Sequence, residues 1–215
     1  MQIIEELSKK RKHHSDNQSM LQKFCLDKLQ INPLPNNKSE IWRMTNKSKL
    51  ARFLDYKLSH DFYEPIIPSL KKSQNLIRLI IGGDKKINLK EKDWEIKELD
   101  EQNIFNLLQQ KLIDCDTTQN WSDLLNQFLT NKKNICGLHI SGRNIPHIEI
   151  ITNAKNNLFN SRTLVLNIEK NTKVDISQIN LGDENCSLLN SSYLYLGEDS
   201  QVNHGIVSYG KSKSH

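Results

Sequence analysis

A cysteine and three histidines in the second half of the chain are the residues whose types could hold a metal ion. Cys186 and His204 would form one pair of ligands if their segments lie together. His139 and His147 would form a second pair if the strands that carry them are neighbours. A thiol is more often buried as a small apolar side chain, and an imidazole more often faces solvent. We therefore predict no catalytic, cofactor-binding or metal-binding residue from these spacings.

Acid–base chemistry has weaker support. Glu149 and Asp175 are carboxylates that could line the groove of a carbohydrate-cleaving β-helix enzyme, but no spacing links either one to a partner. The sequence contains no glycine-rich phosphate loop, no G-x-S-x-G elbow and no H-E-x-x-H zinc motif. A β-helix enzyme that acts on carbohydrate is therefore the least favoured alternative.

The net charge of +5 comes from 30 lysines and arginines against 25 acidic residues. Part of the excess lies in Lys9–Lys12 near the start and in Lys211 and Lys213 near the end. A basic run can attract nucleic acid or an anionic membrane, but no aromatic residue interrupts this one and no nucleic-acid motif follows it. We expect a solvated terminus, with no nucleic-acid or membrane partner. A free-standing binding module with a basic N-terminal arm is the alternative interpretation.

The cysteines indicate a reducing compartment. They form no C-x-x-C pair and match no spacing of zinc ligands; they are Cys25, Cys115, Cys136 and Cys186. The first apolar residues run directly into Glu5-Glu6, which is not typical of a signal peptide. No run approaches the roughly 18 apolar residues of a membrane-spanning helix. We expect a cytoplasmic chain with reduced thiols.

Periodic apolar residues predict mostly helices in residues 1–134, which we interpret as an N-terminal helical domain. Helical spacing occurs at residues 20–29, 50–58, 104–113 and 121–129. Ser122 is the candidate N-cap of the last helix. Apolar runs at Leu76–Ile81 and Ile87–Leu89 flank Gly82-Gly83-Asp84, a pattern that predicts a short β-hairpin within this domain.

Strand-like runs replace the helices in residues 135–215. They lie at residues 135–140, 147–151, 163–166, 174–176, 193–196 and 202–207. Asn160–Leu166 resembles Asn190–Leu196, an offset of about thirty residues. Repeated strands without intervening helices indicate the first coils of a parallel β-helix, in which alternate leucines point inward. Two adjacent hairpins of a β-sandwich are the alternative. The predicted fold class is α+β.

Several segments carry motifs of a known family. Pro35–Leu50 resembles the N-terminal motif of the SufD family, P…K-x-E-x-W-[RK]-x-T…L, through Pro35, Lys38, Glu40, Trp42, Arg43, Thr45 and Leu50. Later segments resemble the family in the same order, at residues 76–89, 125–126, 145–148, 160–179 and 193–204. Together these segments extend over nearly the whole chain.

The resemblance implies a role in iron–sulfur cluster assembly. SufD is a subunit of the SUF assembly scaffold, together with SufB and the ATPase SufC. The family's fold is an N-terminal helical domain, a right-handed parallel β-helix and C-terminal helices. Because SufD is not an enzyme by itself, the resemblance implies no catalytic activity. It implies SufB and SufC as partners, with no cofactor bound by this chain alone.

The sequence also departs from the family. Asn131–Asn134 stands where the family usually has Asp-Gly, and Ile140-Ser141-Gly142 replaces a V-P-x-G segment. Both changes lie in turns, where substitution is tolerated. The sequence stops at His215, part-way through the coils. The family's cluster-related histidine, its SufB-pairing end and its SufC-docking helices all lie in the half beyond this point. We therefore expect a truncated scaffold subunit and assign no functional residue by resemblance.

Overall fold

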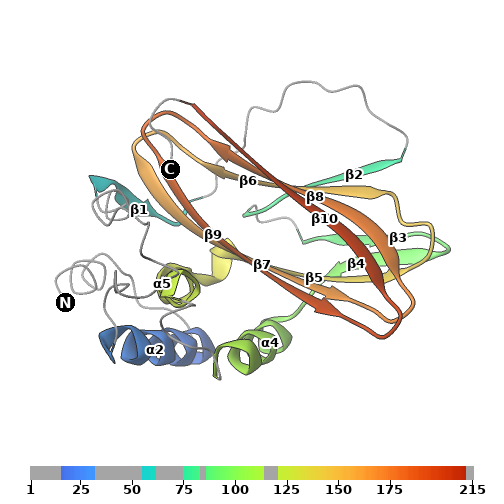
Figure 1. The fold of residues 1–215 in the computed structure, drawn as a ribbon, viewed down its shortest axis with the longest axis horizontal. Helices are drawn as coiled ribbons and strands as arrows, with labels where there is room; N and C mark the ends of the chain where they lie inside the picture. The colour runs from blue at the N-terminus through green and yellow to red at the C-terminus, as the bar shows by residue number, and fades with distance from the viewer. Residues whose placement is uncertain (1–15, 32–54, 62–74, 83–85, 114–120, 212–215) are drawn as a thin grey trace, which may run out of the picture.

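The computed structural model describes residues 16–31, 55–61, 75–82, 86–113 and 121–211 (Figure 1). Three α-helices and two β-sheets lie in these residues, which confirms the predicted α+β class. The basic run Lys9–Lys12 and the SufD-like segment Pro35–Leu50 lie outside the described residues. In the described part of the chain, no helix is both long and apolar enough to cross a membrane.

The α-helices form where apolar spacing predicts them. They are α2 (Asp16–Ile31), α4 (Glu101–Ile113) and α5 (Trp121–Leu129), and the 3-10 helix η3 (Lys132–Asn134) follows α5. Asp100 caps α4, because its carboxylate accepts a hydrogen bond from the backbone N–H of Asn103 at 2.8 Å. Ser122 lies within α5 rather than before it, so the predicted N-cap is wrong. The expected helix at residues 50–58 is also wrong at its end, where β1 (Lys57–Ser59) is a strand.

The strands form two sheets. Sheet A contains β1, β3 (Asn88–Lys90), β4 (Trp94–Glu98), β5 (Ile135–Gly142), β7 (Leu158–Ile168) and β9 (Ser187–Leu196). Sheet B is entirely parallel and contains, in order, β2 (Leu76–Ile80), β6 (His147–Ala154), β8 (Lys173–Gly182) and β10 (Gln201–Gly210). All six strands predicted after residue 135 are confirmed.

Successive strands from β5 onward alternate between the two sheets and pair in parallel with a register of 28 residues. The predicted repeat, with an offset of about thirty, is therefore two residues too long: Asn190 lies beside Arg162, not beside Asn160. Side chains on a strand alternate between faces with a period of two, so a shift of two residues keeps every side chain on its face. The leucine pattern alone does not separate the two registers.

The connections between these strands carry a second period. Five residues in them have positive φ between 48° and 60°: Asn144, Asn157, Asn171, Asn185 and Asp199. Asn and Asp tolerate this left-handed conformation better than other residues with a side chain. One such residue thus ends nearly every strand, at intervals of 13 or 14 residues.

The predicted β-hairpin at residues 76–89 is wrong. β2 pairs in parallel with β6 in sheet B, whereas β3 pairs antiparallel with β4 in sheet A. The glycines between β2 and β3 therefore connect two sheets instead of two paired strands. The antiparallel hairpin in this region is β3–β4.

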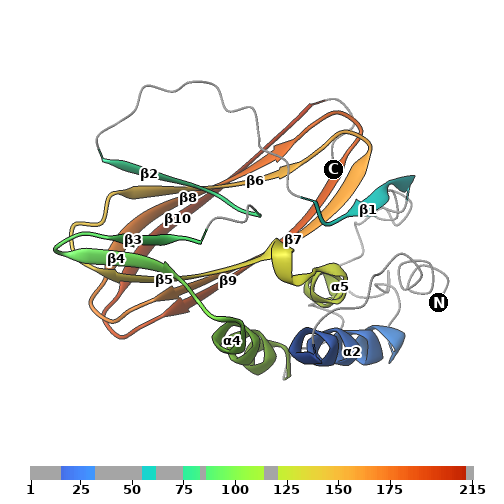
Figure 2. The same ribbon diagram turned by 180° about the vertical axis from the view of Figure 1, so that it is seen from behind.

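Two apolar clusters hold the fold together. One lies between the sheets and includes Ile140, Leu166, Ile150 and Ile176 from four strands. The other joins α2, α4 and α5 to the opposite side of sheet A, through residues such as Leu29, Leu108, Phe128, Val165 and Tyr193. Figures 1 and 2 show the three helices gathered on one side of sheet A, with sheet B on the other. Sheet B therefore has one face without an α-helix of the described chain against it.

Strands from the first 134 residues are part of both sheets. β1 pairs with β7, β2 with β6, and β4 with β5. The division at residue 134 stays a prediction, since these pairings join the two sequence regions in common sheets.

Candidate functional site

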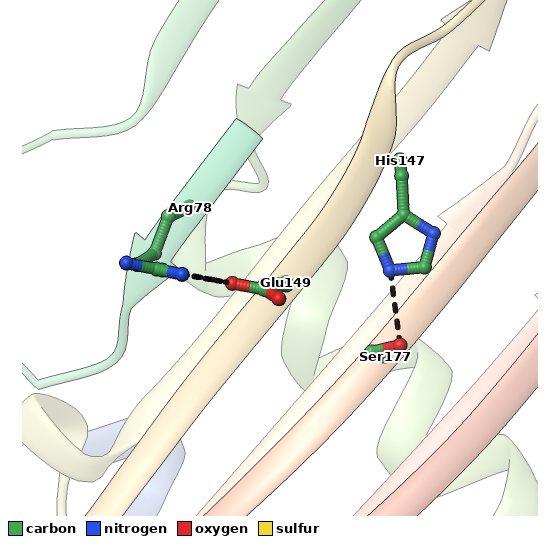
Figure 3. A network of polar contacts seen from close by, with 4 residues as sticks. All are labelled: Arg78, His147, Glu149 and Ser177. Carbon is green, nitrogen blue, oxygen red and sulfur yellow. Dashed lines mark hydrogen bonds and ion pairs between the residues drawn. The ribbon is translucent and has the colours of Figure 1, made fainter. Parts of the chain in front are cut away.

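The outer face of sheet B carries the largest group of titratable and polar side chains on neighbouring strands. On β6 and β8, Ile148 and Ile176 point inward and are buried. The residues on either side of them point outward, since side chains alternate along a strand. This arrangement brings His147, Glu149 and Ser177 onto one surface, which we call the outer polar face (Figure 3).

An ion pair occupies one edge of the outer polar face. Arg78 of β2 lies beside Glu149 of β6 in the parallel register. Its Nε donates to the Glu149 carboxylate at 2.8 Å, and its second nitrogen lies 2.7 Å from the same oxygen (Figure 3). The two side chains are only 26% and 15% exposed, so the pair is better shielded from water than a typical surface pair. Each charge is therefore largely satisfied within the fold.

A histidine and a serine meet next to this ion pair. The Nε2 atom of His147 lies 2.9 Å from the Ser177 Oγ atom (Figure 3). A base within hydrogen-bond reach of a hydroxyl is the first requirement of a nucleophilic serine. The second is a set of donors for the developing oxyanion. Ser177 lies on β8, between β6 and β10, where backbone N–H groups serve the sheet ladder. The pair therefore has the geometry of polar recognition rather than of acyl transfer.

The outer polar face continues onto β10. The Asn203 amide donates to the Asp175 carboxylate at 2.7 Å. Gly205 lies beside Ser177, and a Cβ added there would meet no atom within 4 Å. Together with His147, these residues line a shallow hollow. The hollow presents donors and acceptors side by side but does not enclose a ligand.

The structure does not assemble the predicted Cys186–His204 pair into a metal centre. Cys186 lies just before β9 of sheet A, and its thiol donates to the backbone oxygen of Asp183 at 3.1 Å. His204 lies on β10 of sheet B, beside Ile176. Burial raises the pKa of the Cys186 thiol and lowers the pKa of His204. Among the described residues, no group of three or more histidines, cysteines and acids could hold a metal ion.

The condition for the second histidine pair is not met. His139 lies on β5 of sheet A, 3.5 Å from the Asn167 amide, whereas His147 lies on β6 of sheet B. The strands that bear them are therefore not neighbours. Nearby, burial raises the pKa of the Cys136 thiol to about 12, which leaves it protonated and inert at neutral pH.

The last two strands expose apolar side chains. Leu194 and Leu196 of β9 are 38% and 56% exposed, and Ile206 of β10 is 58% exposed. Leu194 lies beside the fully buried Leu166, so the exposed residues continue a row of the core between the sheets. We call this surface the β9–β10 end. It is the largest group of exposed core-type side chains in the described chain.

Sequence reasoning found Glu149 and Asp175 but missed Arg78 and Ser177. One signal for Arg78 exists: it is the single charge in an apolar run, as Glu149 is in another run. Nothing in the sequence pairs the two runs, which are 71 residues apart. Comparisons of this chain with protein-family models, with curated proteins and with solved structures found no match.

Proposed function

We propose that this protein is a SufD-like component of the SUF iron–sulfur cluster assembly scaffold, with SufB and SufC as its partners. In this role the chain is not an enzyme. It contributes surfaces on which other subunits dock. The proposal rests on the sequence motifs and on one structural observation, the 28-residue register of the strands.

That register supports the finer fold that the family has, a right-handed parallel β-helix preceded by helices. Each strand from β5 to β8 has its parallel partner one coil of 28 residues later. A β-sandwich built of hairpins would pair neighbouring strands antiparallel instead. Helices α2, α4 and α5 cover sheet A alone, as expected for a helical domain beside the coils.

The β9–β10 end is the surface that best suits a protein partner in this scaffold. Its exposed leucines and isoleucine extend the rows of the core, so a partner strand placed there would bury them. We infer that SufB docks at this end, since the family pairs with SufB through an end of its β-helix.

Co-purification with SufB and SufC tests the proposal. The tagged chain is co-expressed with both proteins, and the complex is measured by size-exclusion chromatography with light scattering. We expect a complex with the wild type and its loss with Leu196→Arg. The matched control is Met20→Arg on α2, whose side chain is 61% exposed and lies away from the β9–β10 end. The proposal is wrong if the wild-type chain forms no complex with either protein.

The outer polar face supports a second candidate function, a free-standing binding module. Its shallow hollow offers His147, Asp175 and Ser177 to a polar partner. The same module would carry the basic arm Lys9–Lys12. Nucleic-acid binding measured at several salt concentrations, with the arm intact and deleted, tests that version. No binding by the intact chain would remove it.

A further inference from the structure

A cavity of about 430 Å³ lies beside helix α4, far in sequence from the outer polar face and unused by the proposed scaffold role. Six apolar side chains line it: Leu21, Leu99, Ile104, Phe105, Leu108 and Ile135. Its volume falls within the range of roughly 300–1,000 Å³ that is usual for small-molecule sites. A predominantly apolar wall of this kind favours a ligand with a hydrocarbon body.

The rim of the cavity is charged, and most of its acids are already engaged. The Asp100 carboxylate accepts hydrogen bonds from the backbone and the side chain of Asn103, at 2.8 and 2.7 Å. Glu101 binds the Lys132 ammonium at 2.5 Å, which ties α4 to η3 across the rim. Neither acid is therefore available to repel an anion or to hold a cation. Glu98 is the remaining carboxylate of the lining.

The cations of the rim are less engaged than the acids. Lys86 lines the cavity, and an adjoining hollow of about 340 Å³ shares Lys86, Glu98 and Lys132 with it and adds Lys133. In the described chain, no ion pair involves Lys86 or Lys133. Two ammonium groups against one carboxylate leave a net positive rim above an apolar cavity.

We propose that this cavity binds a medium-chain fatty acid. The hydrocarbon chain lies among Ile104, Phe105 and Leu108, and the carboxylate meets Lys86 and Lys133 at the rim. Apolar burial supplies the affinity, and the two ammonium groups select an anionic head over a neutral one. The cavity size limits the length of the chain that can be accommodated.

Isothermal titration calorimetry on the full chain with fatty acids of increasing length tests the proposal. From hexanoate to decanoate we expect the affinity to rise about tenfold for every two carbons, and to stop rising once the tail outgrows the cavity. An affinity that continues to rise with length would show partition onto an open apolar surface and would overturn the proposal. Absence of any heat with decanoate, with the protein folded by circular dichroism, would overturn it as well.

Two sets of variants locate the ligand. Ile104→Trp fills the cavity and should abolish binding, whereas Ile113→Trp, at a 46% exposed position of the same helix, should leave it unchanged. Ile104 contacts Gly137 of β5, so this variant could disturb the packing of α4. The double variant Lys86→Ala, Lys133→Ala avoids that risk. It should weaken decanoate binding about tenfold and change decanol binding by less than about twofold. An equal loss for both ligands would contradict the assigned head-group contacts.

Discussion

The outer faces of the two sheets use the same polar side chains in opposite environments. Against sheet A, the buried Asn126 of α5 donates to the Arg162 backbone oxygen at 2.6 Å and accepts from the Ser161 hydroxyl at 2.5 Å. On sheet B, the exposed Asn203 donates to Asp175 at 2.7 Å. The bond lengths are similar, but only the first set of bonds is shielded from water.

The difference teaches which polar contacts hold this fold and which are available to a partner. A buried polar group that loses its hydrogen bond cannot recover one from water, whereas an exposed group can. The polar contacts under α5 therefore fix the helix on sheet A. Those of the outer polar face can be exchanged for contacts with a ligand or with solvent at little cost.

The largest effect should come from the apolar layer between the helices and sheet A. Phe128 is fully buried in the cluster that includes Val165 and Tyr193. Phe128→Ala should lower the free energy of unfolding by about 3–5 kcal/mol, through lost burial and the cavity left behind. The matched control, Ile113→Ala at a 46% exposed position, should change it by less than about 1 kcal/mol. Urea unfolding measures both. Equal losses would mean that the helices do not pack on sheet A as described.

The second prediction compares the two asparagines directly. Asn126→Ala removes the partner of Ser161 and leaves the Arg162 backbone oxygen without its donor, so we expect a loss of about 2–3 kcal/mol. Asn203→Ala exposes its partner Asp175 to water, and we expect a change within about 0.5 kcal/mol. Unfolding in urea at one pH compares the two variants. Similar losses in both would contradict the contrast between the two faces.

The ion pair between Arg78 and Glu149 tests an intermediate case, because it lies on the outer polar face but is partly shielded. A double-mutant cycle with both alanine variants should give a coupling energy of about 0.5–1 kcal/mol, which decreases as salt is added. The Lys211–Asp183 pair is more exposed, at 59% and 39%, and should couple more weakly. A stronger coupling for the exposed pair would show that shielding does not set these energies.

Much of the fold could be predicted from local patterns. The stripe at Leu21, Cys25 and Leu29 forms the buried face of α2, and the alternation at Val174 and Ile176 forms the inner face of β8. Such patterns depend only on the period of the element, which is 3.6 residues in a helix and two in a strand. They state which face is buried without stating what buries it.

The pairing of strands could not be predicted in the same way. β2 precedes two glycines and another strand, which is the local pattern of a hairpin, yet its partner β6 lies 71 residues later. A parallel partner requires a long connection, so no local turn marks it. The outer polar face was missed for that reason, since Arg78 and Glu149 meet only through this pairing. The positive-φ residues from Asn157 to Asp199, at intervals of 14, were the one sequence signal of the true period.

The last prediction separates the two faces of sheet B by pH. His204 lies on β10 beside the buried Ile176, so it faces the space between the sheets, and its Nε2 has no hydrogen-bond partner in the described chain. Burial lowers its pKa below the ordinary value of about 6.5. The unfolded chain therefore takes up a proton more readily than the folded one. The stability that neutral His204 contributes is complete above this ordinary pKa and decreases as the pH falls below it.

His204→Gln removes this titration and keeps a polar side chain in place. The difference in the free energy of unfolding between wild type and variant should shrink or reverse from pH 8 to pH 5, because only the wild type takes the unfavourable proton. The effect should be the smallest of the four, since the imidazole is partly open to solvent. NMR titration of the ring gives an independent measurement of its pKa. If the two stability curves stay parallel over this range, His204 faces water, and the inner face of β10 is as open as the outer one.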